Sequence, residues 1–439
     1  MNFADSEVVA SILIKAGHRI ANNLDDADCV LINTCAIRDN AEQRVRKRVR
    51  ELQAQQQRHR LYIGVLGCMA ERLQSQLMVE EENVSFVMGP DTYRRLPEVL
   101  SHLNEGEKQA AVELSTEETY ADIQPVRLGG NGISAYISIM RGCQNYCSYC
   151  VVPYTRGRER SRDPQTIVDE ARILFEQGYK EVNLLGQNVN SYKWSVDSGP
   201  QSVGFPELMD RVASIDPRLR VRFATSHPKD LSDELLEVMA RHANICRCIH
   251  LPVQSGNNRV LKLMNRHYTV EWYLDRVGAI RRYLPDCSIT TDVIAGFCSE
   301  TEEEHQDTLR LFRQVGYDYA YMFKYSLRPD TYAAKHLHDD IPDEVKTRRL
   351  EEIIALQGEV ALENNRRDVG KTFEVLVEGT SRRSKEQLFG RNSQNKVLVF
   401  DRGDAKPGDY VQVRVTGCTA ATLLGTIHHS RVTIHENHK

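Results

Sequence analysis

Short apolar runs alternate with helical patterns from residue 133 to about residue 324, and this alternation constrains the fold more than any other feature. Two of the helices have clear terminal signals. In one, Asp163 is the predicted N-cap, Pro164 is the first helical residue and Gly178 ends the helix. In the other, Thr301-x-x-Glu304 matches a capping box. Six strand–helix units predict a partial TIM-like barrel, in which functional groups lie on the loops that follow the strands. The predicted strands are 135–140, 181–185, 220–225, 248–253, 288–294 and 319–324.

Three cysteines follow the first predicted strand at a spacing that suits one metal centre. Cys143, Cys147 and Cys150 form a C-x3-C-x2-C pattern, with aromatic Tyr149 just before the last sulfur. Thiolates favour zinc or iron–sulfur clusters. Structural zinc requires four ligands, usually in two close pairs, and no second C-x2-C or H-x3-5-H pair follows nearby. A 4Fe–4S cluster with one open iron is therefore favoured over a zinc site or three unrelated core cysteines.

Polar residues follow the later predicted strands, at the same end of the barrel as the cysteines. Any one of them has an alternative explanation as a turn or capping residue. Several at one rim favour a binding site for a small molecule. These residues are Gln187, Asn188, Ser226, His227, Gln254, Ser255 and Asp292.

Residues 1–103 also alternate between helices and strands, which predicts a small doubly wound parallel sheet. The predicted strands are 29–33, 61–66 and 84–88, and the predicted helices are 5–16, 39–53 and 93–103. Cys35 and Cys68 fall just after two of these strands. Because ligand sites gather at the carboxyl ends of parallel strands, both thiols are candidates for one site. Two ordinary buried cysteines remain the alternative.

The rest of the chain completes a three-domain α/β organisation. Residues 104–132 lack apolar periodicity and are predicted as a linker, and residues 133–367 form the barrel domain. Residues 368–434 change to β periodicity, with strands at 373–377, 397–400 and 411–415, which predicts a small OB-like β-barrel.

Composition indicates a protein of a reducing compartment. The chain has 439 residues and eleven cysteines, its start is polar and acidic, and no apolar run approaches the ~18 residues of a membrane span. We therefore expect a cytoplasmic protein with no membrane contact. Five further cysteines have no ligand-like spacing and are interpreted as ordinary buried thiols: Cys246, Cys248, Cys287, Cys298 and Cys418.

Local basic segments indicate RNA binding despite a net charge of −4. A single charge run is usually a solvated face, but three runs beside a metal centre and a β-barrel favour RNA. The first run lies within residues 44–50 of a predicted helix. The candidate RNA contacts come from the other two runs and are Arg156, Arg158, Arg160, Arg382, Arg383 and Lys385.

The three-cysteine motif resembles that of the radical S-adenosylmethionine (SAM) enzymes, whose open iron binds SAM. The whole chain is similar to the methylthiotransferases of that superfamily, which have an N-terminal auxiliary-cluster domain, a radical SAM domain and a C-terminal TRAM β-barrel. Within them, it is most similar to the group that acts on isopentenyladenosine in tRNA. The stretches that carry the resemblance are 33–46, 67–72, 147–162, 184–192, 251–256 and 291–297.

This resemblance implies insertion of a methylthio group at carbon 2 of the isopentenylated adenosine beside the tRNA anticodon. One SAM would methylate a sulfur on an auxiliary 4Fe–4S cluster, and a second SAM would supply the radical. Cys143, Cys147 and Cys150 would hold the radical SAM cluster, and Cys35 and Cys68 the auxiliary one. The implied partners are the tRNA anticodon stem-loop, a flavodoxin- or ferredoxin-type electron donor and iron–sulfur carrier proteins.

Three other functions compete with this one. Two are methylthiolation of threonylcarbamoyladenosine in tRNA and methylthiolation of a ribosomal-protein aspartate. The third, from a different class, is a non-catalytic RNA-binding protein with structural zinc, which would need no SAM.

The auxiliary cluster of the family has three cysteine ligands, whereas Cys35 and Cys68 offer two. The family's first cysteine lies in a Gly-Cys-Gln-Met-Asn stretch that would end at Met1-Asn2 of this sequence, as in a truncated chain or one with a late start codon. We therefore expect this chain to bind its auxiliary cluster poorly and to methylthiolate slowly.

Overall fold

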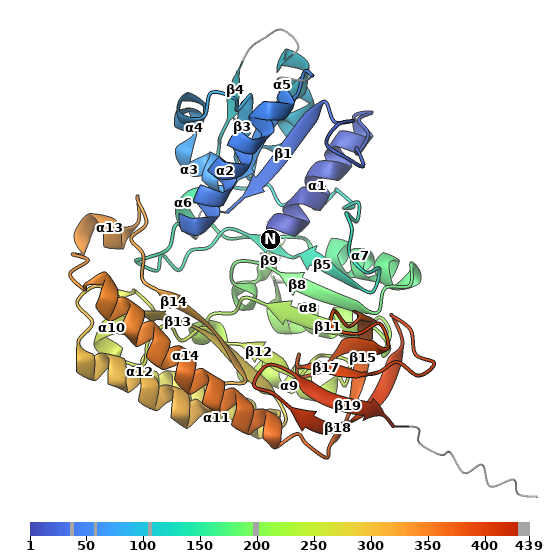
Figure 1. Ribbon diagram of the computed structural model, residues 1–439, viewed down its shortest axis with the longest axis vertical. Coiled ribbons are helices and arrows are strands. Elements are labelled where there is room, and N and C mark those ends of the chain that lie inside the picture. Colours follow the sequence, from blue (N-terminus) through green and yellow to red (C-terminus); the bar gives the residue numbers. More distant parts are fainter. Residues whose placement is uncertain (36–38, 57–58, 104–107, 196–201, 429–439) are drawn as a thin grey trace, which may run out of the picture.

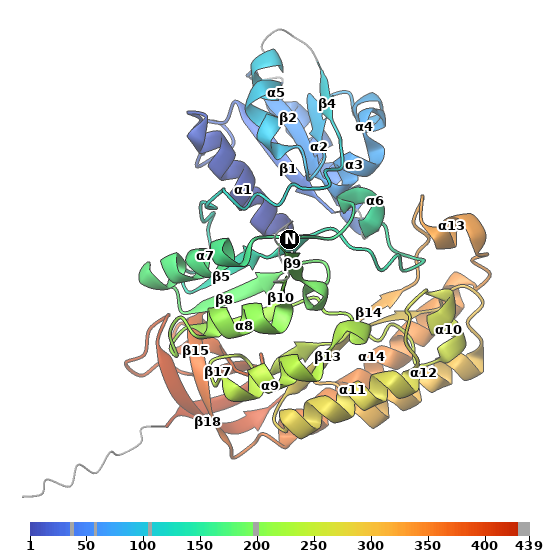
Figure 2. The same cartoon turned by 180° about the vertical axis from the view of Figure 1, so that it is seen from behind.

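The computed structural model describes residues 1–35, 39–56, 59–103, 108–195 and 202–428. An N-terminal α/β unit lies against one side of a central barrel, and a small β-barrel lies at the other side (Figures 1 and 2). The predicted α/β fold class is confirmed. Parts of three predicted stretches lie outside the described residues: 36–38 of the stretch 33–46, 104–107 of the predicted linker and 429–434 of the predicted C-terminal domain.

The N-terminal unit is built on a parallel sheet of order β1-β2-β3-β4. Two separate hydrophobic clusters involve this sheet, with Phe86 and Met88 in one and Val65 and Val87 in the other, as expected for a sheet covered on both faces. Strand β4 lies within the stretch predicted as a linker, so the sheet has one strand more than the sequence predicted. The strands are β1 (Cys29–Thr34), β2 (Tyr62–Gly67), β3 (Phe86–Met88) and β4 (Gln109–Ala111), and the helices are α1 (Asn2–Lys15), α2 (Asp39–Gln56), α3 (Cys68–Leu73), α4 (Ser75–Glu80), η1 (Tyr93–Arg95) and α5 (Leu96–Leu103).

Six parallel strands form the central open barrel in two halves, of order β11-β8-β5 and β12-β13-β14. Backbone hydrogen bonds join the halves, because Val221 N donates to Asn244 O and Cys246 N donates to Val221 O, both at 2.9 Å. All six predicted strands are present. They are β5 (Ser134–Ser138), β8 (Glu181–Leu185), β11 (Arg220–Ala224), β12 (Cys248–His250), β13 (Ser288–Ala295) and β14 (Tyr319–Lys324).

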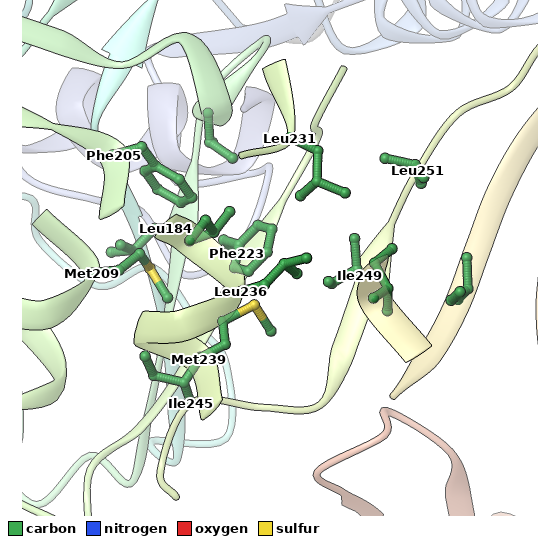
Figure 3. Packing of buried hydrophobic residues seen from close by; sticks show 14 of the residues in the cluster. Leu184, Phe205, Met209, Phe223, Leu231, Leu236, Met239, Ile245, Ile249 and Leu251 are labelled. Atoms are coloured by element: carbon green, nitrogen blue, oxygen red, sulfur yellow. The ribbon is translucent and has the colours of Figure 1, made fainter. Parts of the chain in front are cut away.

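Helices cover the outer face of the barrel and bury its main hydrophobic core, part of which is shown in Figure 3. The predicted caps are confirmed: the Asp163 side chain accepts hydrogen bonds from the amides of Gln165 and Thr166, and Thr301 and Glu304 form a capping box. The helices are α7 (Pro164–Glu176), α8 (Phe205–Ala213), α9 (Asp233–Arg241), α10 (Asn258–Leu263), α11 (Val270–Tyr283), α12 (Glu302–Val315), α13 (Tyr332–His336) and α14 (Asp343–Arg366), and shorter elements are η2 (Val189–Ser191), η3 (Pro228–Asp230), β9 (Lys193–Ser195) and β10 (Ser202–Gly204).

The C-terminal unit is a closed barrel of order β15-β16-β17-β19-β18. It contacts the amino ends of the central strands: Arg222 donates to Asn392 O at 2.7 Å, and Arg220 donates to Arg391 O at 2.8 Å. Two of its strands, β16 and β19, were not predicted. The strands are β15 (Thr372–Thr380), β16 (Gln387–Asn392), β17 (Val397–Asp401), β18 (Tyr410–Cys418) and β19 (Leu423–Ile427).

Across the described residues, no helix combines the length and the apolar character that a membrane crossing demands.

A buried ion-pair network joins the N-terminal unit to the central barrel. Asp5 of α1 accepts from Arg141 at 2.8 Å and from Arg156 at 2.7 Å, while Arg160 binds both carboxylate oxygens of Asp91 at 2.9 Å. Burial alone would raise the pKa of Asp5, but Arg141 and Arg156 lower it to about 2. Because these charges are withdrawn from water, each depends on its partners.

Replacing Asp91 with alanine should destabilise the protein strongly. Arg160, of which 5% is exposed, would be left buried beside fewer counter-charges, and breaking such a pair costs about 3–5 kcal/mol. Urea unfolding followed by circular dichroism measures this change in the free energy of unfolding. The control is Arg367→Ala, which breaks an exposed pair with Glu363 and should cost less than about 0.5 kcal/mol. Equal effects of the two substitutions would contradict the structural role of the network.

Candidate metal centre

The three-cysteine loop leaves the carboxyl end of the first barrel strand and is closed by a short hairpin of β6 (Met140–Arg141) and β7 (Arg160–Ser161). Gly142 opens the loop with φ +77°, and a Cβ atom there would lie 1.9 Å from Arg158 O. Only glycine fits both this backbone conformation and this close approach. Cys143 N donates to Gly157 O at 3.1 Å, which anchors the first cysteine to the returning chain.

The far side of the loop is held by distant parts of the barrel. Ser148 N donates to Met264 O at 3.0 Å, its hydroxyl donates to Leu263 O at 2.8 Å, and its carbonyl accepts from Ala333 N at 2.7 Å. The loop that carries the sulfurs is therefore fixed by elements more than 100 residues away in the sequence.

The sulfurs have hydrogen-bond donors beside them. Arg266 Nη1 lies 3.2 Å from Cys147 Sγ, and Asn145 Nδ2 lies 3.5 Å from Cys143 Sγ. Without a metal, burial raises the pKa of the Cys143 thiol to about 11, and burial together with the Cys147 thiolate raises that of Cys150 further. Three thiols in such surroundings become ligands when a cation offsets their charge.

The spacing of the sulfurs fits a cluster better than a single ion. A tetrahedral zinc site with bonds of about 2.3 Å would draw its sulfurs to within about 4 Å of one another. Among the described residues, Cys143, Cys147 and Cys150 do not form a group with all three sulfurs within 4.8 Å. A 4Fe–4S cluster holds its ligands further apart, because each sulfur binds a different iron.

Several rim residues present unused polar atoms on the same side of the barrel. Asn188 is 1% exposed and His227 is 3% exposed, yet Asn188 Oδ1, His227 Nε2 and Gln187 Oε1 are buried without a hydrogen-bond partner among the described residues. Buried polar atoms are normally satisfied, so these three indicate a polar ligand. Burial lowers the pKa of His227 strongly, which keeps its imidazole neutral.

The other rim residues have structural partners. Gln254 N donates to Asp292 O at 2.9 Å, which brings these two residues together across neighbouring strands. The Ser226 hydroxyl donates to His250 O, and the Ser255 hydroxyl accepts from Asn257 N at 3.3 Å. Tyr149 is half-buried and lies edge-on against Phe297, with ring centroids 6.3 Å apart.

Two residues that the sequence did not single out link the cysteines to the rim. Arg266 contacts Cys147 and also donates to Tyr268 Oη at 3.1 Å and to Pro252 O at 2.9 Å. The ring of Tyr268 packs against His227 at 5.5 Å. An arginine 119 positions from its cysteine carries no spacing signal, so only the fold identifies it.

Cys35 and Cys68 occupy equivalent positions after neighbouring strands, as predicted. Thr34 pairs with Gly67 in the parallel register of β1 and β2, so the next residue on each strand is a cysteine. Gly67 has φ +92°, and a Cβ atom there would lie 2.7 Å from Thr34 O. Cys68 packs against Val151, the residue that follows Cys150. Cys35 and Cys68 therefore lie on the side of the N-terminal unit that faces the three-cysteine loop.

The prediction that Arg156 and Arg160 bind RNA is wrong. Arg156 is 3% exposed, donates to Cys68 Sγ at 3.2 Å and pairs with Asp5, while Arg160 is buried against Asp91. Their positive charge is used inside the protein, to join its units. Arg158 is exposed, and so are Arg382, Arg383 and Lys385 in the turn between β15 and β16.

The remaining cysteines are not grouped. Cys246 and Cys298 are buried as predicted, whereas Cys248, Cys287 and Cys418 are half-buried. In the part of the chain that the structure describes, the one set of potential ligand atoms within 4.8 Å is that of Glu302, His305 and Glu352. Its carboxylates already pair with Arg348 and Arg349, which disfavours a cation.

Three family models match the chain, one on each unit of the fold. Residues 137–312 match the radical SAM superfamily, residues 1–89 match the uncharacterized protein family UPF0004, and residues 366–428 match the TRAM domain. The matches fall on the barrel with the three-cysteine loop, on most of the N-terminal sheet and on the closed β-barrel.

Solved structures show the same fold at low sequence identity. The radical S-adenosylmethionine methyltransferase TsrM from Kitasatospora setae has a TM-score of 0.53 and 17% identity, covering 74% of this chain and 66% of its own. The cobalamin-dependent S-adenosylmethionine radical enzyme OxsB has a TM-score of 0.52 and 12% identity, covering 81% and 53%.

Curated relatives are similar over nearly the whole chain. Proteins named tRNA-2-methylthio-N(6)-dimethylallyladenosine synthase from Phocaeicola vulgatus and Bacteroides fragilis are each 57% identical, over 97% of this chain and 93% of their own. The protein of that name from Amoebophilus asiaticus is 56% identical over 97% of this chain and 90% of its own. The chain therefore belongs to the tRNA-2-methylthio-N(6)-dimethylallyladenosine synthase family of radical SAM enzymes.

Proposed function

We propose that this protein inserts a methylthio group at carbon 2 of isopentenyladenosine beside the anticodon of tRNA. The observation that carries the proposal is the identity of 57% over 97% of the chain to synthases of this name, together with the three-cysteine loop at the barrel mouth. The zinc-protein alternative is disfavoured, because the cysteine loop lies within residues 137–312, which match the radical SAM superfamily.

The radical SAM family uses a 4Fe–4S cluster and SAM, and the residues at the barrel mouth fit both. When bound, this pair supplies one electron and a carbon-centred radical, which the substrate requires because an aromatic C–H bond has no acidic proton to remove. Cys143, Cys147 and Cys150 hold the cluster. The Arg266 guanidinium, whose Nη1 lies 3.2 Å from Cys147 Sγ, offers a charge-assisted hydrogen bond to this ligand.

SAM is held by the rim of the barrel. The unpartnered atoms of Gln187, Asn188 and His227 face its polar groups, and Tyr149 offers an aromatic surface. Asp292 and Gln254 complete the rim from the opposite half of the barrel, and Ser226 and Ser255 support the neighbouring backbone. A site that is assembled before SAM arrives loses little conformational entropy on binding.

Cys35 and Cys68 would supply ligands to a second, auxiliary 4Fe–4S cluster, at which the sulfur would be delivered. The register of β1 and β2 supports this assignment, since both thiols leave one end of the sheet. Arg156 lies 3.2 Å from Cys68 Sγ. Among the described residues, Arg156 Nη1 and Asn33 Oδ1 are buried without hydrogen-bond partners, which leaves polar capacity beside the thiols.

RNA contacts the exposed basic side chains. Arg382, Arg383 and Lys385 lie together in one turn of the closed β-barrel, and Arg158 lies beside the cysteine loop. Lys and Arg bind phosphates without reading sequence. These four side chains therefore provide affinity for RNA, and the central barrel provides the specificity for the base. A flavodoxin- or ferredoxin-type donor supplies electrons, and iron–sulfur carrier proteins load the clusters.

Iron analysis after anaerobic reconstitution tests the cluster assignments. We expect Cys143→Ala to lose about four irons per chain, the content of one 4Fe–4S cluster. The control Cys298→Ala, which changes a buried thiol elsewhere, should keep its iron. Iron that remains in Cys143→Ala belongs to the second cluster, and adding Cys68→Ala should remove it. Zinc in place of iron, or an iron content that Cys143→Ala leaves unchanged, would contradict these assignments.

Mass spectrometry of RNA products tests the reaction. Reconstituted protein given SAM, a reductant and an anticodon stem-loop should replace one hydrogen of isopentenyladenosine with a methylthio group. A stem-loop with unmodified adenosine or with threonylcarbamoyladenosine should remain unchanged, and Cys150→Ala should form no product. Equal reaction of the threonylcarbamoyl substrate would overturn the substrate assignment.

Neutralising the basic turn should weaken RNA binding. The triple variant Arg382→Ala, Arg383→Ala, Lys385→Ala should lower the affinity for the stem-loop and reduce the slope of log affinity against log salt by about 2. Fluorescence anisotropy at several salt concentrations measures both. A triple variant of exposed arginines on α7, α9 and α12 makes the same change in net charge and should keep the slope: Arg172→Ala, Arg241→Ala, Arg313→Ala. If both triple variants lost affinity and salt slope equally, the effect would come from net charge alone, which would contradict a specific role of the basic turn.

A further inference from the structure

The inner face of the second half-barrel exposes two aromatic rings. Tyr319 is 53% exposed and Tyr321 is 49% exposed, whereas Ala320 between them is 1% exposed. Side chains alternate across a strand, so the two tyrosines lie on the face opposite the buried core. Ala320 belongs to that core, together with Ile353 and Leu356 of α14, so the tyrosines point away from the covering helix.

A histidine and an aspartate lie beside the tyrosines on the same face. Tyr321 pairs with Asp292 in the register of β13 and β14, and the His250 ring meets Tyr321 edge-on at 5.8 Å. His250 Nε2 lies 3.4 Å from Asp292 Oδ1, and its Nδ1 lies 2.9 Å from Thr290 Oγ1. The rings of Tyr319 and Tyr321 are also edge-on, at 5.0 Å.

The open barrel explains why these rings are exposed. In a closed eight-stranded barrel, inward side chains pack against one another and fill the interior. Here β14 is the last strand of its half, with no further strand beside it among the described residues. Single exposed tyrosines are common, but two rings beside a histidine–aspartate pair on an inner face form a surface suited to a ligand.

This surface connects to the rim already described. Asp292 O accepts from Gln254 N at 2.9 Å, and Gln254 belongs to the rim that faces SAM. Asp292, which pairs with Tyr321 in the strand register, therefore links the tyrosines to that rim. The chemistry of a group bound over the tyrosines is constrained by Asp292, whose negative charge disfavours a phosphate and favours a neutral group with an N–H donor.

We propose that Tyr319, Tyr321, His250 and Asp292, here called the tyrosine face, bind the adenine base of the substrate. The base stacks on the tyrosine rings, as unpaired RNA bases stack on aromatic side chains. Asp292 accepts from the single N–H that remains on the prenylated amino group, and His250, whose Nε2 lies 3.4 Å from Asp292 Oδ1, holds that carboxylate in place. This inference rests on the proposed function and names the residues that hold its substrate.

Kinetics with the isopentenylated stem-loop test the tyrosine face. Tyr321→Ala should raise the KM for the stem-loop about tenfold or more, because a stacking partner is lost, and should lower kcat less. Tyr321→Phe keeps the ring and should stay within about twofold of wild type. The control is Trp272→Ala, which removes an aromatic side chain that is 44% exposed on α11 and should leave KM unchanged.

Two outcomes would overturn the inference. One is a Tyr321→Ala variant with the KM of the Trp272→Ala control. The other is a parallel fall in RNA-independent SAM cleavage, which would place the ring in the SAM site. Failure of the proposed function is a separate result, because wild type would then leave the stem-loop unmodified. In that case fluorescence anisotropy would still test the tyrosine face. It would show whether wild type binds the prenylated stem-loop more tightly than the unmodified one, and whether Tyr321→Ala loses that preference.

Discussion

The buried contact of Arg156 with Asp5 and Cys68 is the interaction on which both sets of cysteines depend. Arg156 follows the three-cysteine loop directly, Asp5 belongs to the first helix, and Cys68 leaves the N-terminal sheet. A guanidinium placed inside a protein must meet partners that offset its lost hydration. Because those partners come from the N-terminal unit, the charge holds that unit against the barrel mouth and brings the two groups of sulfurs to the same side of the barrel.

The other units are arranged around this joint. The cysteine loop is fixed at one end by Gly142 and at the other by hydrogen bonds of Ser148, so the carboxyl ends of the barrel strands remain open to ligands. The TRAM barrel binds the opposite, amino ends through Arg220 and Arg222. The two tyrosines of β14 lie at the edge of the central barrel where no further strand follows among the described residues.

Local patterns predicted the elements that have strong local signals. The central strands and the helix caps at Asp163 and Thr301 were predicted, because apolar periodicity and capping depend on residues close in sequence. The strands β4, β16 and β19 were missed. The three residues of β4, Gln109–Ala111, are mostly polar or small, so pairing with β3 creates that strand more than its own composition does.

The sequence by itself determined the family, the three-cysteine motif and the placement of Cys35 and Cys68 just after strands of a parallel sheet, because these follow from residue identity and from local apolar patterns. Only the tertiary structure decided what each charge does. Arg156, Arg158 and Arg160 are alike in sequence, yet two are buried in ion pairs and one is exposed. The same holds for Arg266 and Tyr321, whose roles depend on neighbours far away in the chain. Burial and counter-charges are long-range properties, and no local pattern encodes them.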